Sequence, residues 1–172
     1  EMLEDIRIFD EYYDEDFFAY AEDTDLGWRA RLRGWKCAYA PAALVYHAHS
    51  ASAGKYSSLK AFLVERNRMW LEVKNFPLVL IAYGHIFTFH RYMYQAYGAV
   101  AGKGAAGEFT RDYSKSRLVG ILGKAYASAM KGLPKMIKKR RLIQRNAVKN
   151  RRDIFELLKI YGIGTKAIAI KG

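Results

Sequence analysis

The chain has 172 residues, of which 51% are apolar and 27% charged, so it has enough material to bury a core. This composition excludes collagen-like, low-complexity and globally disordered proteins. The single cysteine, Cys37, excludes an internal disulfide and a CxxC metal clip, and it indicates a reducing compartment. The first residues lack the basic and apolar regions of a signal peptide, and the initial Glu1 suggests that the chain is part of a longer protein.

The net charge of +12 is divided unevenly along the chain. Residues 1–25 hold eleven acidic residues and one base, a net charge of −10, which leaves +22 on residues 26–172. Residues 131–152 alone contain ten lysines and arginines and no acidic residue. This asymmetry indicates that the two ends have different roles, because an acidic segment can bind metal and a basic one can bind phosphates.

The first 50 residues predict a helix, a loop, a second helix and two strands, an order typical of the end of an α/β domain. The second helix begins near Asp23 or Thr24, either of which can serve as its N-cap, and Gly34 ends it. Pro41 separates the two strands. The expected ranges are 2–9 for the first helix, 10–21 for the loop, 23–33 for the second helix, and 36–40 and 43–47 for the strands.

The rest of the chain predicts helices. A helical pattern runs over 57–75, and the uncharged run of 16 residues over 75–90 is shorter than the roughly 20 residues that span a bilayer. Because many of its residues are Tyr, Phe and His, we expect an interfacial or partner-covered helical hairpin over 77–102, with a spanning helix as the alternative. A flexible link then precedes three further helices, over 115–131, 135–147 and 151–160.

The densest group of chemically useful residues is Glu22-Asp23-Thr24-Asp25, at a helix start. The positive end of the helix keeps a carboxylate ionised, and an ionised carboxylate on a fixed helix end can take a proton from a bound hydroxyl. Plain helix capping is the alternative interpretation.

Two other groups have the right residue types for ligand binding. His47 and His49 share one face of a strand, so they could bind a divalent ion with carboxylates from elsewhere, or they could be one core and one exposed histidine. Arg29, Arg31 and Arg33 could bind a diphosphate, or they could form a solvated helix face.

The basic run over 131–152 fits nucleic acid electrostatically. Apolar residues nevertheless interrupt it at helical spacing: Leu133, Met136, Ile137, Leu142 and Ile143. A basic amphipathic helix near an aromatic apolar hairpin favours docking on anionic lipid over binding to nucleic acid. We therefore expect a peripheral location on the cytoplasmic, inner face of the cell membrane, with a simple solvated helix as the remaining alternative.

An ordered series of motifs in the first half of the chain resembles one known family. It consists of Phe9-Asp10-Glu11, Asp14 to Leu26, Trp28 to Leu32, Gly34-Trp35, Tyr39-Ala40-Pro41, Val45-Tyr46-His47 and Glu65-Arg66-Asn67-Arg68. Residues 1–77 resemble glycosyltransferase family 2, notably the bacterial rhamnosyltransferase-like enzymes that act on cell-surface polysaccharides. From residue 78 onward the similarity is general, because such enzymes carry aromatic and basic helical tails.

The resemblance implies a fold and a division into parts. Residues 1–76 would be the C-terminal part of a GT-A (Rossmann-like) α/β domain, 77–102 the aromatic apolar helical hairpin, and 103–172 a mainly α-helical, membrane-interfacial basic tail. The family's first half, with its nucleotide-binding strands and Asp-x-Asp metal motif, is absent, so we expect this fragment to be inactive alone. Asp14-Glu15-Asp16 spells Asp-x-Asp but lies in the loop before the Glu-Asp motif, and we do not assign it to the metal.

The resemblance also implies roles for the site residues. Asp23 matches the catalytic base of the inverting members, with Glu22 beside it. His47 matches a ligand or neighbour of the divalent ion, Mn²⁺ or Mg²⁺, which the missing half would largely bind. Trp28, Arg29 and Arg31 follow the Glu-Asp motif. They lie where similar enzymes approach the sugar nucleotide or the acceptor.

The expected function is that of part of an inverting glycosyltransferase that moves a hexosyl or rhamnosyl unit. Its donor would be a nucleoside diphosphate sugar, and its acceptor a cell-surface polysaccharide or a lipid-linked glycan. The alternative is a non-catalytic basic module that binds a membrane or nucleic acid. The ordered motifs over 9–47 favour the transferase, because neither form of the alternative requires a Glu-Asp helix start followed by a Val-Tyr-His strand.

Overall fold

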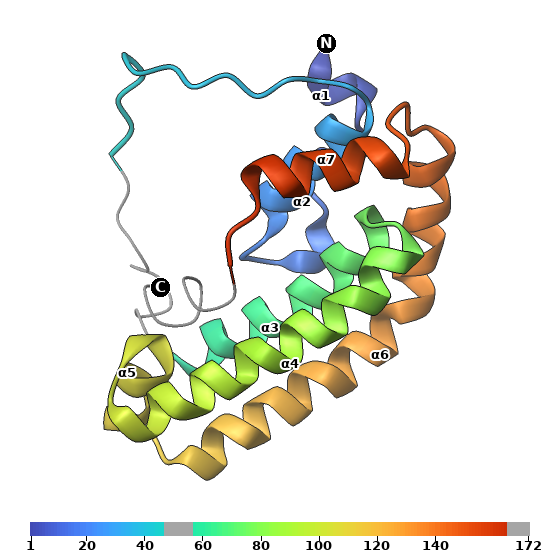
Figure 1. Cartoon of the computed structure of the whole chain (residues 1–172). Helices are drawn as coiled ribbons and strands as arrows, with labels where there is room; N and C mark the ends of the chain where they lie inside the picture. Colours follow the sequence, from blue (N-terminus) through green and yellow to red (C-terminus); the bar gives the residue numbers. More distant parts are fainter. Residues whose placement is uncertain (47–56, 165–172) are drawn as a thin grey trace.

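The computed structural model describes residues 1–46 and 57–164, and the regular elements in these ranges are helices (Figure 1). The short elements α1 and η1 belong to an N-terminal segment that lies against the longer helices. In chain order the elements are α1 (Met2–Asp5), η1 (Glu15–Phe17), α2 (Glu22–Leu32), α3 (Ser58–Asn75), α4 (Leu78–Ala101), α5 (Gly104–Asp112), α6 (Lys115–Arg145) and α7 (Arg151–Tyr161).

The predicted α/β fold, the end of a GT-A (Rossmann-like) domain, is wrong for the described chain. Residues 36–46 form no strand, and the β-pairing present in the described ranges is one isolated bridge between Ile8 and Glu11. The side chains of Tyr39, Val45 and Tyr46 are 83–91% exposed, and their segment runs away from the helices (Figure 1). A strand needs a neighbouring strand to pair its N–H and C=O groups, and no described segment offers one.

The main packing contact joins α3 and α6, which run side by side in the same direction (Figure 1). Trp70 of α3 packs edge-on against Phe17, and its Nε1–H donates a 3.0 Å hydrogen bond to the carbonyl of Ala129 in α6. One apolar cluster forms around this contact: Phe17, Trp70, Leu71, Ala129 and Met136. Trp70, one of the apolar residues at helical spacing in 57–75, therefore faces α6.

A second apolar cluster joins the N-terminal segment and α2 to α6 and α7, through Ile8, Leu32, Ile143 and Ile154. Leu32 at the end of α2 also accepts hydrogen bonds from the backbone of Val148 and Lys149, which connects α2 to the α6–α7 turn. Residues 1–76 and 103–172, expected as separate parts, therefore share both apolar clusters.

Two helical regions are more continuous than expected. Residues 115–145 form one helix of 31 residues, although Pro134 lies inside it. The proline removes one backbone hydrogen bond, but α6 packs along α3 on both sides of it, so the helix continues. Residues 78–101, expected as a hairpin, form the single helix α4, which runs opposite to α3 and α6 and ends at Gly102 with φ +67°. Among the described helices, none combines the length and apolarity that crossing a membrane requires.

Close packing between α3 and α6 makes Gly132 sensitive to substitution. A Cβ atom at this position would lie 2.8 Å from Cε2 of Trp70. We expect Gly132→Ala to lower the free energy of unfolding by about 1–3 kcal/mol, because the two helices must move apart. Urea denaturation followed by tryptophan fluorescence measures the change.

The matched control is Gly123→Ala in the same helix, where an added Cβ meets nothing within 4 Å. Alanine restricts the unfolded backbone and favours helix, so this variant should gain about 0.5–1 kcal/mol. Equal effects of the two substitutions would contradict the tight α3–α6 contact.

Candidate functional site

The first turn of α2 carries the two predicted catalytic carboxylates. The helix begins at Glu22, and its N-cap is Ala21, whose side chain makes no capping hydrogen bond. Asp23 therefore lies inside the first turn and is not the N-cap. Its carboxylate is exposed, and Oδ1 accepts hydrogen bonds from the backbone N–H and the hydroxyl of Thr24, at 2.6 and 3.2 Å.

Glu22 lies beside Asp23 and is half-buried. Its Oε2 atom is buried and has no hydrogen-bond partner among the described residues. Buried polar atoms in folded proteins nearly always have a partner, so this oxygen is an exception in the first turn of α2.

The loop before α2 is strained and is held in place from α3. Phe18, Tyr20 and Ala21 have φ values of 63°, 67° and 68°, a region that residues with a Cβ avoid. The amide Nδ2 of Asn67 points at the carbonyls of Phe17, Ala19 and Tyr20, at 2.9, 2.8 and 2.7 Å. One side chain of α3 thus fixes the direction in which the chain enters α2.

Arg66, the neighbour of Asn67, adds to this support. Its guanidinium donates to the carbonyls of Asp16 and Phe17, at 3.2 and 3.0 Å, and stacks over the ring of Trp70. Arg66 and Asn67 of the Glu65-Arg66-Asn67-Arg68 motif singled out in the sequence therefore anchor the loop that precedes α2.

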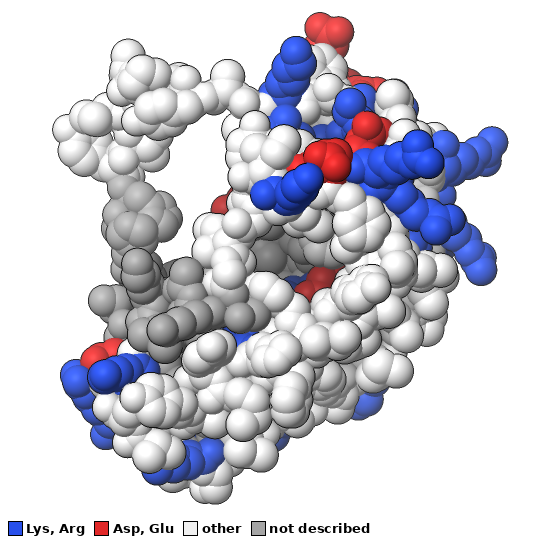
Figure 2. All heavy atoms as spheres, in the orientation of Figure 1, with Lys and Arg blue, Asp and Glu red and all other residues white. Residues whose placement is uncertain are grey.

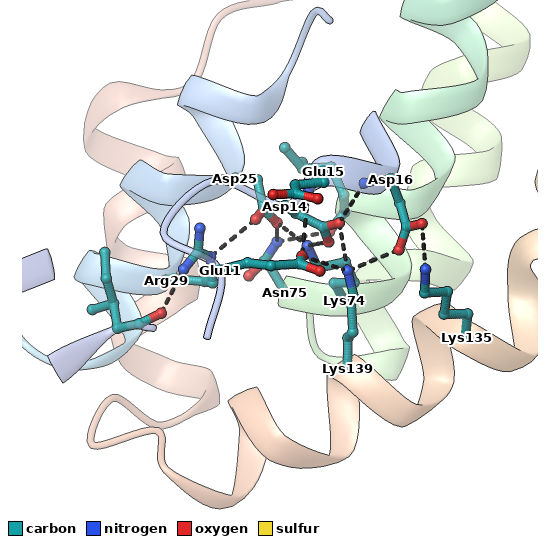
Figure 3. Close-up of polar contacts among 12 residues, drawn as sticks. Glu11, Asp14, Glu15, Asp16, Asp25, Arg29, Lys74, Asn75, Lys135 and Lys139 are labelled. Atoms are coloured by element: carbon teal, nitrogen blue, oxygen red, sulfur yellow. Dashed lines mark hydrogen bonds and ion pairs between the residues drawn. The ribbon is translucent and has the colours of Figure 1, made fainter. Parts of the chain in front are cut away.

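A cluster of buried charges lies beneath the first turn of α2 (Figure 3). We call Asp14, Asp25, Arg29, Lys74 and Lys139 the buried ion cluster; their side chains are 0–2% exposed. The ammonium group of Lys74 contacts both Asp14 and Asp25, the latter at 2.9 Å. Lys139 contacts Asp14 from the other side, at 2.6 Å. Four segments of the chain meet in this cluster: the N-terminal loop, α2, α3 and α6.

Both carboxylate oxygens of Asp25 are paired. Arg29, one helical turn later, donates to Asp25 Oδ2 at 3.0 Å, and Asn75 donates to Asp25 Oδ1 at 2.8 Å. Arg29 also donates to the backbone carbonyls of Ile6 and Tyr12. Since Asp25 follows Asp23 by two residues in the same helix, these contacts fix the rotation of α2 and the position of Asp23.

Lys139 and Lys135 extend the cluster to the surface. Lys139 contacts Glu11 at 3.1 Å and Asp16 at 2.8 Å, and Lys135 contacts Asp16 at 2.5 Å. Burial alone would raise the pKa of Asp14, but the charges of Lys74 and Lys139 outweigh it and hold that pKa below its usual value. Burial alone would lower the pKa of Lys139, but the carboxylates of Asp14, Asp16 and Glu11 outweigh it and raise that pKa.

The predicted site residues fall into three groups. Glu22 and Asp23 lie together at the start of α2, and Arg31 is half-buried farther along this helix. Trp28 and Arg29 are part of the packing: Trp28 lies edge-on to Phe76 with ring centroids 4.7 Å apart, and Arg29 is 2% exposed with its donors directed at protein atoms. The predicted metal-binding residue, His47, lies outside the described residues.

The described chain does not supply a metal site. No group of three or more His, Cys, Asp or Glu residues in residues 1–46 and 57–164 is arranged to hold a metal ion. Asp14-Glu15-Asp16 resembles a metal motif, but Asp14 and Asp16 are both paired with lysines. The expected Mn²⁺ or Mg²⁺ therefore stays a prediction, and the residues described here do not fit it.

Sequence reasoning missed Lys74, Lys139 and Asn75, to which it gave no place in the site. A signal was present in the spacing. Lys74 follows Trp70 by four residues, and Lys139 follows Met136 by three, so both lysines lie on the apolar stripes of their helices.

Comparison with known proteins gives a partial similarity. Over 67 residues the chain is 40% identical to N-acetylglucosaminyl-diphospho-decaprenol L-rhamnosyltransferase of Mycobacterium tuberculosis, in strains CDC 1551 / Oshkosh and ATCC 25618 / H37Rv. The alignment covers 34% of this chain and 22% of each relative, so the chain spans about a fifth of the length of the curated relatives it matches. No family model and no solved structure matches. About a third of the chain is therefore similar to a glycosyltransferase.

The buried ion cluster predicts a large effect of Asp14→Asn on stability. The variant removes one of the carboxylates that face Lys74 and Lys139, which stay buried with less opposing charge. Removing one partner of a buried pair costs about 3–5 kcal/mol, and we expect the lower end of this range because both lysines keep another carboxylate. Urea denaturation at neutral pH measures the loss.

Asp10→Asn is the matched control for Asp14→Asn. Asp10 pairs with Arg7 on the surface, and its side chain is 89% exposed. The same chemical change there should alter the free energy of unfolding by less than about 0.5 kcal/mol. A loss for Asp14→Asn no larger than that of the control would show that the cluster contributes little.

Acid should destabilise the fold through the same group. The pKa of Asp14 is lower in the folded chain than its usual value of about 3.9, so the unfolded chain binds more protons between the two pKa values. The contribution of Asp14 to stability is therefore complete above about pH 5 and is lost as the pH falls through its folded pKa. Urea midpoints measured at a series of acidic pH values should fall less steeply for Asp14→Asn than for the native chain, and equal slopes would refute this assignment.

Proposed function

We propose that this chain belongs to a glycosyltransferase that transfers a hexosyl or rhamnosyl unit from a nucleoside diphosphate sugar to a hydroxyl group of a glycan acceptor. The observation that carries the proposal is the 40% identity to relatives named as L-rhamnosyltransferases. The exposed carboxylate of Asp23, at a helix end supported by buried charges, is consistent with it. The acceptor is a cell-surface polysaccharide or a lipid-linked glycan.

Asp23 acts as the general base in this proposal. Its carboxylate takes the proton of the acceptor hydroxyl while the hydroxyl oxygen forms a bond to the anomeric carbon of the donor. The bond from that carbon to the nucleoside diphosphate breaks, the diphosphate leaves with the electron pair, and the configuration inverts. A divalent ion would offset the charge on the departing diphosphate, and the described residues do not hold one.

The other residues near α2 have supporting roles. Glu22 lies beside Asp23 in the first turn of α2 and has a supporting role there. Arg31 makes no ion pair with the described residues, so it is the arginine of α2 best able to meet a phosphate or sugar. Arg29 acts through Asp25 as a positioning residue, because its guanidinium is engaged with the protein.

The test is Asp23→Asn in the natural polypeptide that contains this chain. We expect kcat to fall about 10²-fold or more, because asparagine cannot accept the proton, while donor affinity is retained. Transfer of a radiolabelled sugar to acceptor measures turnover, and titration calorimetry measures donor binding.

Asp10→Asn is again the control, since it makes the same chemical change at an exposed position away from the first turn of α2. It should leave turnover unchanged. Normal turnover of Asp23→Asn would rule out Asp23 as the base.

A further inference from the structure

One face of α4 is apolar and uncovered. It consists of residues spaced by three or four positions along the helix, so that they lie on one side. Its large apolar side chains are 37–74% exposed: Val79, Tyr83, Ile86, Phe89, Met93, Tyr97 and Val100. We call these residues the α4 face. At 24 residues, α4 extends for roughly 36 Å, so this surface is long as well as apolar.

Polar contacts on the opposite side of α4 hold this face outward. The guanidinium of Arg91 makes two hydrogen bonds to the carboxylate of Glu65 in α3, at 2.8 and 2.7 Å, and Tyr92 donates to the same carboxylate at 2.9 Å. Arg68 of α3 also donates to Thr88, at 3.1 Å. Rotating the α4 face inward would break these buried pairs, so its exposure is built into the fold.

The apolar surface continues onto α6. The hydroxyl groups of Tyr92 and Tyr126 lie 3.2 Å apart, so α4 and α6 are neighbours here. On α6, exposed apolar residues recur at spacings of seven, four and seven: Val119, Tyr126, Met130 and Ile137. Figure 2 shows the result as a broad white area over α4 and α6, with basic groups gathered toward its two ends.

The charges around this surface indicate what it contacts. Arg91, which is buried, is the only formally charged residue between Lys74 and Lys103. Exposed basic residues lie near both ends of α4: Lys103, Arg111, Lys115 and Arg117 at one end, and Arg141, Arg145, Lys149 and Arg151 at the other. A cleft of about 520 Å³ at the second end is lined by Leu78 and Val79 together with Lys149 and Arg151, so apolar and cationic groups meet there.

We propose that the α4 face lies flat on an anionic lipid bilayer. Tyr and Phe side chains favour the membrane interface, and the basic ends attract anionic headgroups. A second copy of the chain fits less well, because its basic ends would face basic ends in either orientation. Duplex nucleic acid presents its charged phosphates and would leave the uncharged aromatic centre without a favourable contact. The proposal stands independently of sugar transfer.

The test is co-sedimentation of the full chain with vesicles of phosphatidylcholine, with and without phosphatidylglycerol. We expect the native chain to bind the vesicles that contain phosphatidylglycerol and to dissociate as salt is raised. The double variant Ile86→Ser with Met93→Ser should lower the bound fraction several-fold at every salt concentration, because it removes apolar area from the α4 face. Arg141→Gln with Arg145→Gln should weaken binding mainly at low salt.

The control for the apolar variant is Leu44→Ser with Val45→Ser. These two residues are at least as exposed as Ile86 and Met93 but lie in the extended segment away from α4, so binding should not change. Circular dichroism checks folding, and Phe89→Ser alone provides a milder second variant.

Three results would overturn the proposal: equal binding by native chain and both α4 variants, equal binding to vesicles without phosphatidylglycerol, or no binding to either vesicle. Sedimentation velocity distinguishes the main rival occupant. A native dimer that Ile86→Ser with Met93→Ser converts to a monomer, without vesicle binding, would assign the face to a second copy. None of these results depends on whether Asp23 supports sugar transfer.

Discussion

The paired charges of Asp14, Asp25, Lys74 and Lys139 are the contact through which the N-terminal segment, α2, α3 and α6 depend on one another. Each of these side chains is almost inaccessible to water, and a buried charge without its partner costs several kcal/mol. If any one of the four segments were displaced, buried charges on the others would lose a partner. Arg29 and Asn75 complete the pairing around Asp25, so the cluster also sets the angle at which α2 leaves the loop before it.

The candidate catalytic end of α2 depends on this arrangement from two sides. The ion cluster holds Asp25 below, while Asn67 holds the strained loop that precedes the helix. Backbone strain of this kind persists where the surroundings determine the conformation, and it is common at functional sites. Asp23 lies between these two supports. Because Asp25 and Asn67 make the contacts that hold the turn, the side chain of Asp23 can face solvent.

Helix α3 lies between the charged interior around α2 and the helix α4. Lys74 and Asn67 connect it to the charged interior around α2, and Glu65 connects it to Arg91 of α4. The contact between Glu65 and Arg91 uses the polar side of α4 and so turns its apolar side outward. An arrangement of this kind would connect a sugar-transferring site and a lipid-facing surface through α3.

The sequence by itself determined the largely helical character of the chain after residue 57 and the uneven charge, because helical periodicity and composition are local properties. It placed the helix over 57–75 correctly, and it placed the N-cap of α2 two or three residues too late, at Asp23 or Thr24 instead of Ala21. It could not show that 36–46 would form no strand, or that Lys74, Lys139 and Arg29 would be buried rather than solvated. Only the tertiary structure decided these points, because strand pairing and charge burial depend on segments as far apart as residues 14 and 139. Burying a lysine on an apolar stripe is unfavourable unless a carboxylate from a distant segment pairs with it. This pairing depends on the tertiary fold.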